Sequence, residues 1–488
     1  MSGRRTPALL LAVLAAAGCA QFSTSRAVEK RTPPSPAVPW NPPPAARAEQ
    51  KPTPPPEIPE KYRKEKTVLS LPEVIDIALR NNPVTKTSWA QARSAAAAVG
   101  QKEAAYFPEI DLGGSVTRQK STTFGGASTF FQTTYGPTAS LSWLLLDFGG
   151  RGGNVEEAKQ ALWAAGWTHD AAIQNVVLQV TSAYYGYGNA KELLVAEEAS
   201  LKESQENYDA ARARHDAGVA TIADVLQAKT ALSQDELALE TVRGQIETIR
   251  GELATALGVP ANIPVDTADL PRDVDVQGVT ASIDALIGRA QKERPDLGAA
   301  RAEAEKARVH VGTVRSERLP VVSAFGSAGR LSYASPSGVP YRTTYSGGLQ
   351  LSLPLFDGGR RAFDVRQARE DAAAAAVQAQ TLEQQVILQV WTSYFAVRTA
   401  AQQVRTSRDL LESATQAEQV TAGRYRSGVG SILDLLTAQR NLAQARAQDV
   451  QARSSWFQSL AQLAHDTGTL GPLPAGSAGP AFEMKGTP

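Results

Sequence analysis

The chain has 488 residues, 42% of them hydrophobic, and is therefore long enough to bury a sizeable core in two or three ordinary domains. Its formal charge is only +1, and no dense lysine and arginine run is interleaved with aromatic residues. This pattern argues against nucleic acid as a partner, and the single cysteine excludes an internal disulfide.

The N-terminus reads as an export signal. Arg4 and Arg5 precede an apolar run over residues 8–17, which is too short to span a membrane but typical of a signal peptide. We assign residues 1–18 to this signal. The mature protein is therefore expected to be exported.

The only cysteine, Cys19, follows this run directly. The surrounding segment resembles a bacterial lipoprotein signal, in which the cysteine is lipidated and becomes the first mature residue. Ala16 stands where that pattern has leucine, and ordinary cleavage near residues 15–17 is the alternative. Lipidation would also remove an unpaired, reactive exported thiol. Ala20, in place of aspartate, resembles lipoproteins sorted to the outer membrane.

Residues 19–68 are rich in proline, as in Thr32-Pro33-Pro34-Ser35-Pro36. Proline disfavours helix and favours an extended or disordered tether. We expect a lipidated tether here, with a binding role for a PxxP-like segment as the alternative.

Self-comparison indicates that the chain after about residue 69 consists of two copies of one unit. Asn82-Pro83 recurs as Arg294-Pro295 after 212 residues, and Tyr184-Tyr185 recurs as Tyr394-Phe395 after 210 residues. A register kept over so long a segment with one small shift indicates duplication. We assign the first copy to residues 69–260, the second to 281–467 and a C-terminal tail to 468–488.

Each copy begins with a short helix and a longer one. The short helix is expected over residues 72–81 and 282–293, because the proline that follows disfavours helix at the residue before it. The second helix, about 22 residues long, ends before Pro108 or Pro320.

Two strands follow in each copy, because large apolar side chains alternate there with small or polar ones. The apolar positions are Ile110, Leu112 and Val116, then Leu141, Trp143 and Leu145, and in the second copy Tyr345, Leu349, Leu351 and Leu353. Four strands of roughly 10 residues suit a bilayer crossing. The Gly- and Ser/Thr-rich segments at 122–128 and 332–340 are expected to be exposed hairpin tips.

A half-buried soluble sheet is the alternative interpretation of this alternation. A lone four-stranded sheet has open edges, however, and the smallest closed barrel has about 8 strands. Several chains must therefore contribute if the strands form a barrel.

Two unusually long helices complete the pattern. Residues 152–217 and 362–427 contain no proline, and some 65 residues at about 1.5 Å each make a rod of about 100 Å. Each rod turns at a glycine and returns through a second helix, over 224–257 or 434–464. The alanine run at 372–376 permits close helix approach, and the apolar positions form narrow seams of the coiled-coil kind.

The turns between these helices have a specific pattern. In each, a glycine can end the first helix in the left-handed conformation, a hydroxyl can cap the next helix, and an aspartate three residues later can complete a capping box. These residues are Gly218, Thr221 and Asp224 in the first turn and Gly428, Ser431 and Asp434 in the second. Helix capping alone is sufficient to explain most of this pattern.

Duplicated strands that lead into a long helical hairpin, in an exported chain, resemble the TolC/OprM-type outer-membrane factors over about residues 69–467. The most specific segment is 353–360, Leu-Pro-Leu-Phe-Asp-Gly-Gly-Arg, which resembles the strand-to-helix junction of that family and is echoed at 145–151. Glycine lets the backbone turn sharply there, at Gly149, Gly150, Gly358 and Gly359. Asp147-Phe148-Gly149 lacks every accompanying element of a kinase or of a phosphate loop.

The resemblance implies a mainly α fold with a transmembrane β-barrel part. Three chains would form a 12-stranded barrel in the outer membrane and an α-helical barrel across the periplasm. The turns would form a periplasmic tip where the duct closes and an adaptor protein docks. The gate or tip candidates are Asp224, Asp434, Thr437, Gly218 and Gly428, and the docking candidates are Val219, Ala220, Thr221, Val429, Gly430 and Ser431. Relatives often have a second acid where this chain has Thr437.

The expected function is that of an outer-membrane channel of a tripartite efflux system, which passes drugs and toxic compounds outward. The expected partners are two further copies of the chain, a periplasmic adaptor, an inner-membrane pump of the RND or ABC type, and outer-membrane lipid. No enzymatic activity and no cofactor are expected, because the four histidines are scattered without metal-ligand spacing. Type I protein secretion, metal efflux, and a soluble periplasmic coiled-coil adaptor or scaffold are the alternatives.

Overall fold

The computed structural model describes residues 68–122, 129–271, 274, 276, 281–334 and 342–471. The expected signal peptide, Cys19 and nearly all of the proline-rich segment lie outside these residues. The same is true of most of both hairpin tips and of the tail from residue 472.

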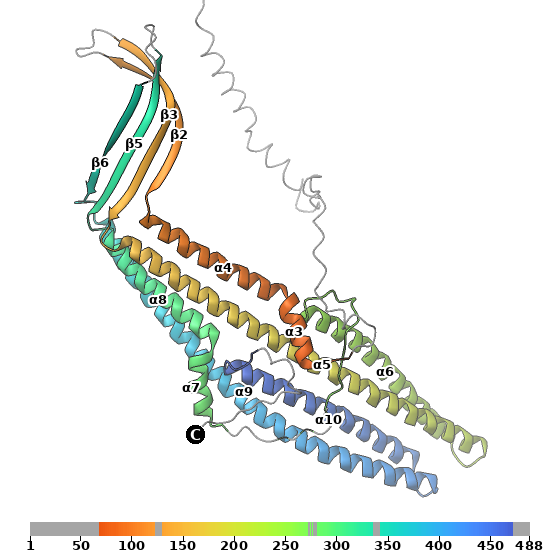
Figure 1. Ribbon diagram of the computed structural model, residues 1–488. Coiled ribbons are helices and arrows are strands. Elements are labelled where there is room, and N and C mark those ends of the chain that lie inside the picture. Colours follow the sequence, from red (N-terminus) through yellow and green to blue (C-terminus); the bar gives the residue numbers. More distant parts are fainter. Residues whose placement is uncertain are drawn as a thin grey trace, which may run out of the picture. The chain divides into compact units, whose positions relative to one another are not determined.

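The first copy of the duplicated unit runs from β1 to α6 (Figure 1). Its elements are β1 (Val68–Leu69), α3 (Leu71–Asn81), α4 (Pro83–Glu103), the 3-10 turn η3 (Ala104–Tyr106), β2 (Glu109–Thr122), β3 (Thr129–Leu146), α5 (Gly150–Asp216) and α6 (Ile222–Ala256).

The second copy repeats this order. Its elements are β4 (Asp266–Thr267), α7 (Ile283–Glu293), α8 (Pro295–Ser316), β5 (Val321–Ala334), β6 (Arg342–Ser352), α9 (Arg360–Arg426) and α10 (Ile432–Asp466). Helices α5 and α9 have 67 residues each, and α6 and α10 have 35 each. The helix bounds agree with the sequence analysis to within two residues, and the structure therefore confirms the duplication of the long hairpins.

Proline separates the two short helices of each copy as expected. Asn82 and Arg294 are extended, with ψ of 126° and 120°, and Pro83 and Pro295 are the first residues of α4 and α8. The backbone N–H at the first position of a helix has no partner within the helix, so proline, which lacks this N–H, is tolerated there. Proline also disfavours helix at the residue before it. The Asn82 side chain also accepts a hydrogen bond from the Val84 N–H at 2.8 Å.

The four long strands form one antiparallel sheet in the order β2-β3-β5-β6, and β1 pairs with β4 in a separate parallel pair. The two hairpins have the same register, because Leu112 pairs with Ala139 while Ala324 pairs with Leu349 at the equivalent positions. Strands β3 and β5 join the two copies. The outer strands β2 and β6 each have one edge without a partner strand in the described part of the chain.

One face of the sheet is apolar and solvent-exposed, as the alternation predicts. Residues paired across antiparallel strands point to the same face, which places Ile110 with Leu141 and Leu112 with Ala139. Ile110 is 72% exposed, Leu112 83% and Leu349 73%. The opposite face contains polar residues such as Asp111, paired with Ser140.

The strands differ from the expected 10 residues. Strands β2 and β5 have 14 residues, β3 has 18 and β6 has 11. The expectation was too short because β2 continues past its apolar stretch through the polar residues 117–122. Leu353 lies beyond β6, and an irregularity between Leu144 and Leu146 interrupts the pairing beside Leu145.

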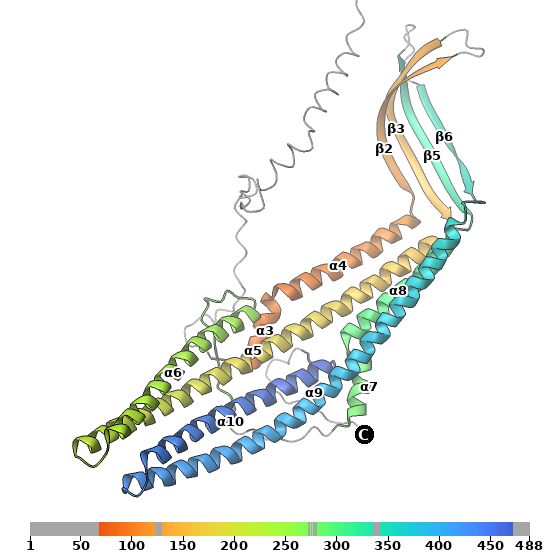
Figure 2. The same ribbon diagram turned by 180° about the vertical axis from the view of Figure 1, so that it is seen from behind.

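The helices below the sheet form a layer in which α4, α5, α8 and α9 are neighbours in that order (Figures 1 and 2). Farther from the sheet, α5 pairs with α6 and α9 pairs with α10 as antiparallel hairpins, and α10 also packs against α5. The α5–α8 and α5–α10 contacts therefore join the first copy to the second.

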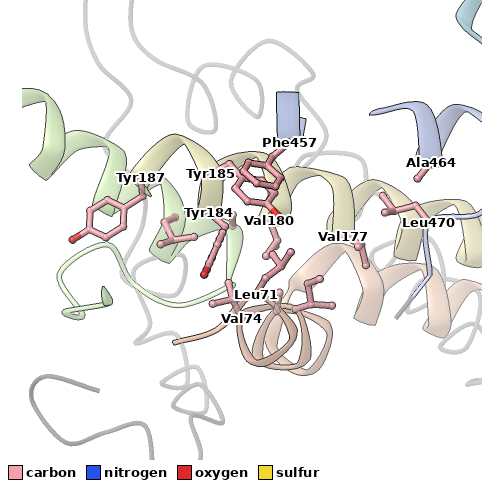
Figure 3. Close-up of a cluster of buried hydrophobic side chains, with 14 of the residues drawn as sticks. Leu71, Val74, Val177, Val180, Tyr184, Tyr185, Tyr187, Phe457, Ala464 and Leu470 are labelled. Carbon is pink, nitrogen blue, oxygen red and sulfur yellow. The ribbon is translucent and has the colours of Figure 1, made fainter. Parts of the chain in front are cut away.

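The largest hydrophobic core lies where the short helices meet the middle of the long ones (Figure 3). Val74 of α3, Val180 of α5 and Leu253 of α6 are fully buried in it. The Tyr185 ring of α5 stacks on Phe457 of α10 with centroids 4.7 Å apart. Replacing a buried leucine such as Leu253 with alanine typically costs about 2–5 kcal/mol.

Among the described residues, no helix is both long enough and apolar enough to cross a membrane.

Candidate functional site at the helical turns

The turn between α5 and α6 is a Schellman motif. Gly218 has φ of +75°, its N–H donates to the His215 carbonyl at 2.8 Å, and the Val219 N–H donates to the Arg214 carbonyl at 2.9 Å. The left-handed conformation favours glycine because it has no Cβ. The helix thus ends where the sequence analysis placed its glycine stop.

Helix α6 then begins with the expected capping box. Thr221 Oγ1 accepts from the Asp224 N–H at 3.3 Å, and Asp224 Oδ2 accepts from the Thr221 N–H at 3.0 Å. Asp224 therefore satisfies a free backbone donor and lies at the positive end of the helix dipole.

The turn between α9 and α10 repeats this geometry, and its backbone passes closer to the end of α9. Gly428 has φ of +80° and the Val429 N–H donates to the Arg424 carbonyl at 3.0 Å. A Cβ at Gly430 would lie 3.1 Å from the Tyr425 backbone nitrogen, whereas the first turn has Ala220 at this place. Gly430 therefore allows a closer backbone approach than alanine would without a small shift of its neighbours, a role that the sequence did not indicate.

Asp434 forms only one of the two bonds of the expected capping box, because its N–H donates to Ser431 Oγ at 3.1 Å but its carboxylate, unlike that of Asp224, does not accept from the N-cap N–H in the described structure. The expectation of a complete box in the second turn was therefore wrong. The Asp434 carboxylate is exposed to solvent. Thr437 lies one helical turn farther and donates its hydroxyl to the Leu433 carbonyl at 2.7 Å. The second acidic position of the resembled family is thus filled by a hydroxyl that bonds the backbone.

The two turns contact each other within one chain. The Arg214 guanidinium lies 4.6 Å from the centre of the Tyr425 ring, and its Nη2 donates to the Arg426 carbonyl at 3.4 Å. A small cluster below them contains Ala211, Ala228 and residues of α9 and α10. Arg214 and Tyr425 lie in the last turns of α5 and α9, and their contact could not be predicted from the sequence because it joins residues more than 200 positions apart.

The docking candidates form an exposed edge. Val219 is 74% exposed and Val429 is 70% exposed, while Thr221 and Ser431 are exposed and Ala220 and Gly430 are partly covered. Each turn thus presents one valine to solvent. An apolar contact of this kind suits another protein surface.

The strand-to-helix junctions use positive φ at equivalent places. Gly149 has φ of +103° and Gly359 +86°, while Gly358 corresponds to Phe148, a non-glycine residue with φ of +50°. Gly150 differs from the expectation of a sharp glycine turn, because its φ is not in the left-handed region. Its role is spatial, since a Cβ there would lie 3.0 Å from both Asp147 Oδ2 and Ser316 Oγ.

An aspartate holds each junction. Asp147 Oδ2 accepts from the Arg151 N–H at 2.5 Å, and Asp357 accepts from the Gly359 and Arg361 N–H groups at 3.1 and 3.2 Å. Desolvation disfavours the charged form of Asp357, but these backbone bonds and the neighbouring arginines outweigh it and lower its pKa. At each junction, an aspartate therefore caps the helix that follows the strand.

The four histidines lie apart from one another. His169 bonds Ser88, His310 bonds Glu157, His215 lies beside Asp216, and His465 lies between Asn175 and Asp466. Within the described ranges, no group of three histidine, cysteine, aspartate or glutamate residues could hold a metal ion.

Comparison with known proteins identifies what the chain resembles. The family model for outer membrane efflux proteins matches residues 74–259 and 286–469, one match for each copy. Protein CyaE of Bordetella pertussis is 28% identical over 423 residues, which cover 85% of this chain and 84% of that protein. The toluene efflux pump outer membrane protein TtgC of Pseudomonas putida is 26% identical, over 81% of this chain and 82% of that one.

Solved structures show the same fold. The outer membrane protein VceC from Vibrio cholerae superposes with a TM-score of 0.72 at 22% identity, over 83% of this chain and 97% of that one. The duplicated hairpins and the four strands per chain are thus shared with a known outer-membrane protein.

Proposed function

The chain belongs to the outer membrane efflux protein family, and we propose that three copies form a duct through which an adaptor and an inner-membrane pump expel toxic organic compounds. Its function as the outer-membrane channel of a tripartite efflux system follows from the family and from relatives named for efflux. The observation that carries it is the match of the family to both copies, each with a strand hairpin and a 67-residue helix. The family is one of transport proteins rather than enzymes.

The trimer is supported by the sheet. Four strands have two open edges and an exposed apolar face, and a closed barrel needs about 8 strands or more. Three chains would supply 12 strands, with the face of Ile110, Leu112 and Leu349 against lipid. The long helices would continue this ring into the periplasm.

The helical turns are proposed as the periplasmic tip. Val219 and Val429 would contact the adaptor, and Asp434 of each chain would line the constriction with Thr437 beside it. Repeating one carboxylate around an axis raises the local negative potential and favours cations. The turns are supported in this role by their exposure and by their place at the ends of the hairpins.

The ends of the chain complete the proposal. Residues 1–18 would be removed as a signal peptide, Cys19 would be lipidated, and residues 19–68 would tether the first copy (69–260) to the membrane. The second copy (281–467) would be followed by a tail over 468–488. The lipid would be a secondary anchor, because the strands of the trimer would hold the duct in the membrane.

Three measurements on the full chain test this function. We expect heat-resistant trimers in outer-membrane fractions, ion conductance in planar bilayers, and higher drug accumulation in cells that lack the protein. Co-purification with an RND-type or ABC-type pump would identify the pathway, and accumulation of an unsecreted protein or of a metal would favour the corresponding duct instead. A monomer in the soluble periplasmic fraction would refute the duct.

Docking can be tested separately. Val429→Glu should reduce co-purification of the adaptor, because a charge would replace an exposed apolar contact at the turn. Val420→Glu is the matched control, since Val420 is also exposed but lies in α9 two helical turns before the glycine. Equal recovery of the adaptor with both variants would contradict docking at this turn.

A further inference from the structure

We propose that the apolar face of the strands binds the phosphate groups of an outer-leaflet glycolipid through a cluster of arginine, threonine and tyrosine that occurs once in each copy. This inference rests on the proposed function, because it takes the apolar face to be in contact with lipid. A duct through the membrane does not by itself require cations on that face. The cluster comprises Arg118, Thr133 and Tyr135 in the first copy and Arg330, Thr343 and Tyr345 in the second.

The cluster recurs with the same displacements as the rest of the duplicated unit. Arg330 follows Arg118 after 212 residues, and Thr343-Thr344-Tyr345 follows Thr133-Thr134-Tyr135 after 210 residues. Neighbouring strand positions differ between the copies, as at Gln119, which corresponds to a leucine. The recurrence of the cluster among changed neighbours indicates that it has the same role in both hairpins.

Strand pairing brings the three residues of each cluster together. In the first copy, Arg118 pairs with Thr133, and Tyr135 pairs with the residue two places before Arg118. The second copy has the same pairs at the equivalent positions. Paired residues point to the same face, and diagonal neighbours lie about 7–8 Å apart, within reach of long side chains. Each hairpin therefore presents a guanidinium group and two hydroxyl groups on one patch.

Both clusters lie on the apolar face of the sheet. Side chains alternate between the two faces along a strand, so Arg118 shares a face with Ile110. Arg330 lies on the same face, because its partner Thr343 is on the side of β6 that also presents Leu349. Both arginines are exposed, and no acidic residue occupies this face within the described ranges of the four strands. The charged residues of the apolar face are therefore all cations.

The place of the arginines along the strands puts them near one rim of the apolar band. Arg118 follows Ile110 by eight residues, which span about 26 Å along the strand at about 3.3 Å per residue. A strand tilt of about 40° turns this length into a height of about 20 Å, close to the top of an apolar band about 25 Å tall. Because β2 leads away from α4, this rim is the one farther from the helices (Figure 1).

A cation is tolerated at this height if it has an anionic partner. Arginine and lysine are strongly unfavourable on the lipid face at the bilayer centre, but near the interface their long stems reach the headgroups. Anionic headgroups attract such cations.

Aromatic residues mark both rims of the same band. Trp143 lies on this face of β3 eight residues after Tyr135, and its ring N–H donates to the Tyr106 carbonyl at 3.0 Å beside the helices. At the other end, Tyr135 is 40% exposed and Tyr345 is 87% exposed. Tryptophan and tyrosine are enriched at membrane–water interfaces. Each arginine lies two residues beyond the level of its tyrosine, and therefore on the headgroup side.

The chemistry of the first cluster favours a phosphate monoester. Lys120 lies on the same face, with its Nζ 5.7 Å from the centre of the Phe131 ring, and Arg118 Cζ lies 5.4 Å from the same centre. Two positive charges around one ring match a phosphate monoester, which carries a charge of about −1.5 to −2 at pH 7. Arginine binds such a group through two parallel N–H donors, and the hydroxyl groups can donate to phosphate or sugar oxygens. A phosphorylated glycolipid supplies both kinds of acceptor.

The experiment uses the full chain, purified in an uncharged detergent and titrated with fluorescently labelled lipid A, a glycolipid with two phosphate monoesters. Arg118→Gln with Arg330→Gln should weaken binding at least tenfold. Arg342→Gln is the matched control, because Arg342 is also exposed and lies in the same sheet but pairs with Leu331 on the opposite face. Lipid A from which the phosphates have been removed should bind the unmodified chain at least tenfold more weakly than intact lipid A.

A second variant keeps the test decisive if the glutamine variant does not form trimers. Arg118→Lys with Arg330→Lys retains the charges but loses the parallel donors, and should bind lipid A about threefold more weakly. Unchanged affinity in the variants that form trimers would overturn the site, as would an equal loss in Arg342→Gln. Equal affinity for phosphatidylglycerol, whose phosphate is a diester, would overturn the choice of a monoester glycolipid.

The outcome is separable from that of the proposed function. Loss of heat-resistant trimers and of conductance in the unmodified chain would count against the duct itself. Trimers that persist and conduct, with lipid A binding that does not depend on Arg118 and Arg330, would overturn this site and leave the duct standing.

Discussion

Replacing Arg453 with methionine should destabilise the protein far more than the same change at Arg243, the equivalent position of the first copy. The Arg453 side chain is 6% exposed, and its guanidinium donates to Glu192 at 2.5 Å and to Asp449 at 3.0 Å. Both carboxylates are also largely buried, and their charges more than offset desolvation and raise the pKa of Arg453. Methionine would leave two buried carboxylates without their cation.

The magnitude follows from burial. Removing one partner of a buried ion pair costs about 3–5 kcal/mol, because the remaining charge stays desolvated. The Arg243 side chain is 51% exposed and its partner Glu240 is 69% exposed, and such surface pairs contribute about 0–1 kcal/mol. We therefore expect a difference of at least about 2 kcal/mol between the two variants.

The assay is urea unfolding of the detergent-solubilised protein, followed by circular dichroism of its helices. Arg453→Met should lower the midpoint clearly, and adding Glu192→Gln to it should recover part of the loss, because one uncompensated charge is removed. Equal midpoints for Arg453→Met and Arg243→Met would show that the buried Arg453 pair contributes no more to stability than the exposed Arg243 pair.

Gly428→Ala should lower the free energy of urea unfolding by about 1 kcal/mol, because the φ of Gly428 is positive. The control Gly423→Ala, inside α9 with open space around it, should raise this free energy by up to about 1 kcal/mol. The reverse order of stability would contradict the turn geometry. Asp434→Asn should lower cation selectivity in planar bilayers, and unchanged reversal potentials would remove Asp434 from the constriction. Desolvation disfavours the charged form of Asp296, but the bond and charge of Arg294 outweigh this effect and lower the pKa of Asp296. The ionised carboxylate therefore contributes its full stability above the unfolded pKa of about 3.9, and this contribution is lost as the pH falls below that value. Asp296→Asn should therefore weaken the loss of thermal stability as the pH falls below about 4, and an unaltered pH profile would count against that contribution. Cys19→Ser should abolish palmitate labelling yet leave trimers in the outer membrane, and loss of all membrane association would make the lipid the main anchor.

Much of the local structure of the turns was predictable because its signals lie within a few residues. The glycine, the hydroxyl and the aspartate of each turn specify a helix end and a helix start, and Gly218 and Gly428 have the expected left-handed conformation. Gly430 was not predicted as a close-approach position, because its role depends on the backbone of Arg424 and Tyr425 folding back onto it. The docking and gating roles of these residues remain predictions.

The two copies, the helix limits and the apolar face of the strands could be predicted from the residues alone. Each of these follows from periodicity or from a proline or glycine that acts on its immediate neighbours. The pairing of β3 with β5 and the contact of Arg453 with Glu192, 261 residues away, could not be predicted in this way. Such contacts depend on which faces pack together over the whole layer. Periodicity identifies a buried face but does not say what covers it.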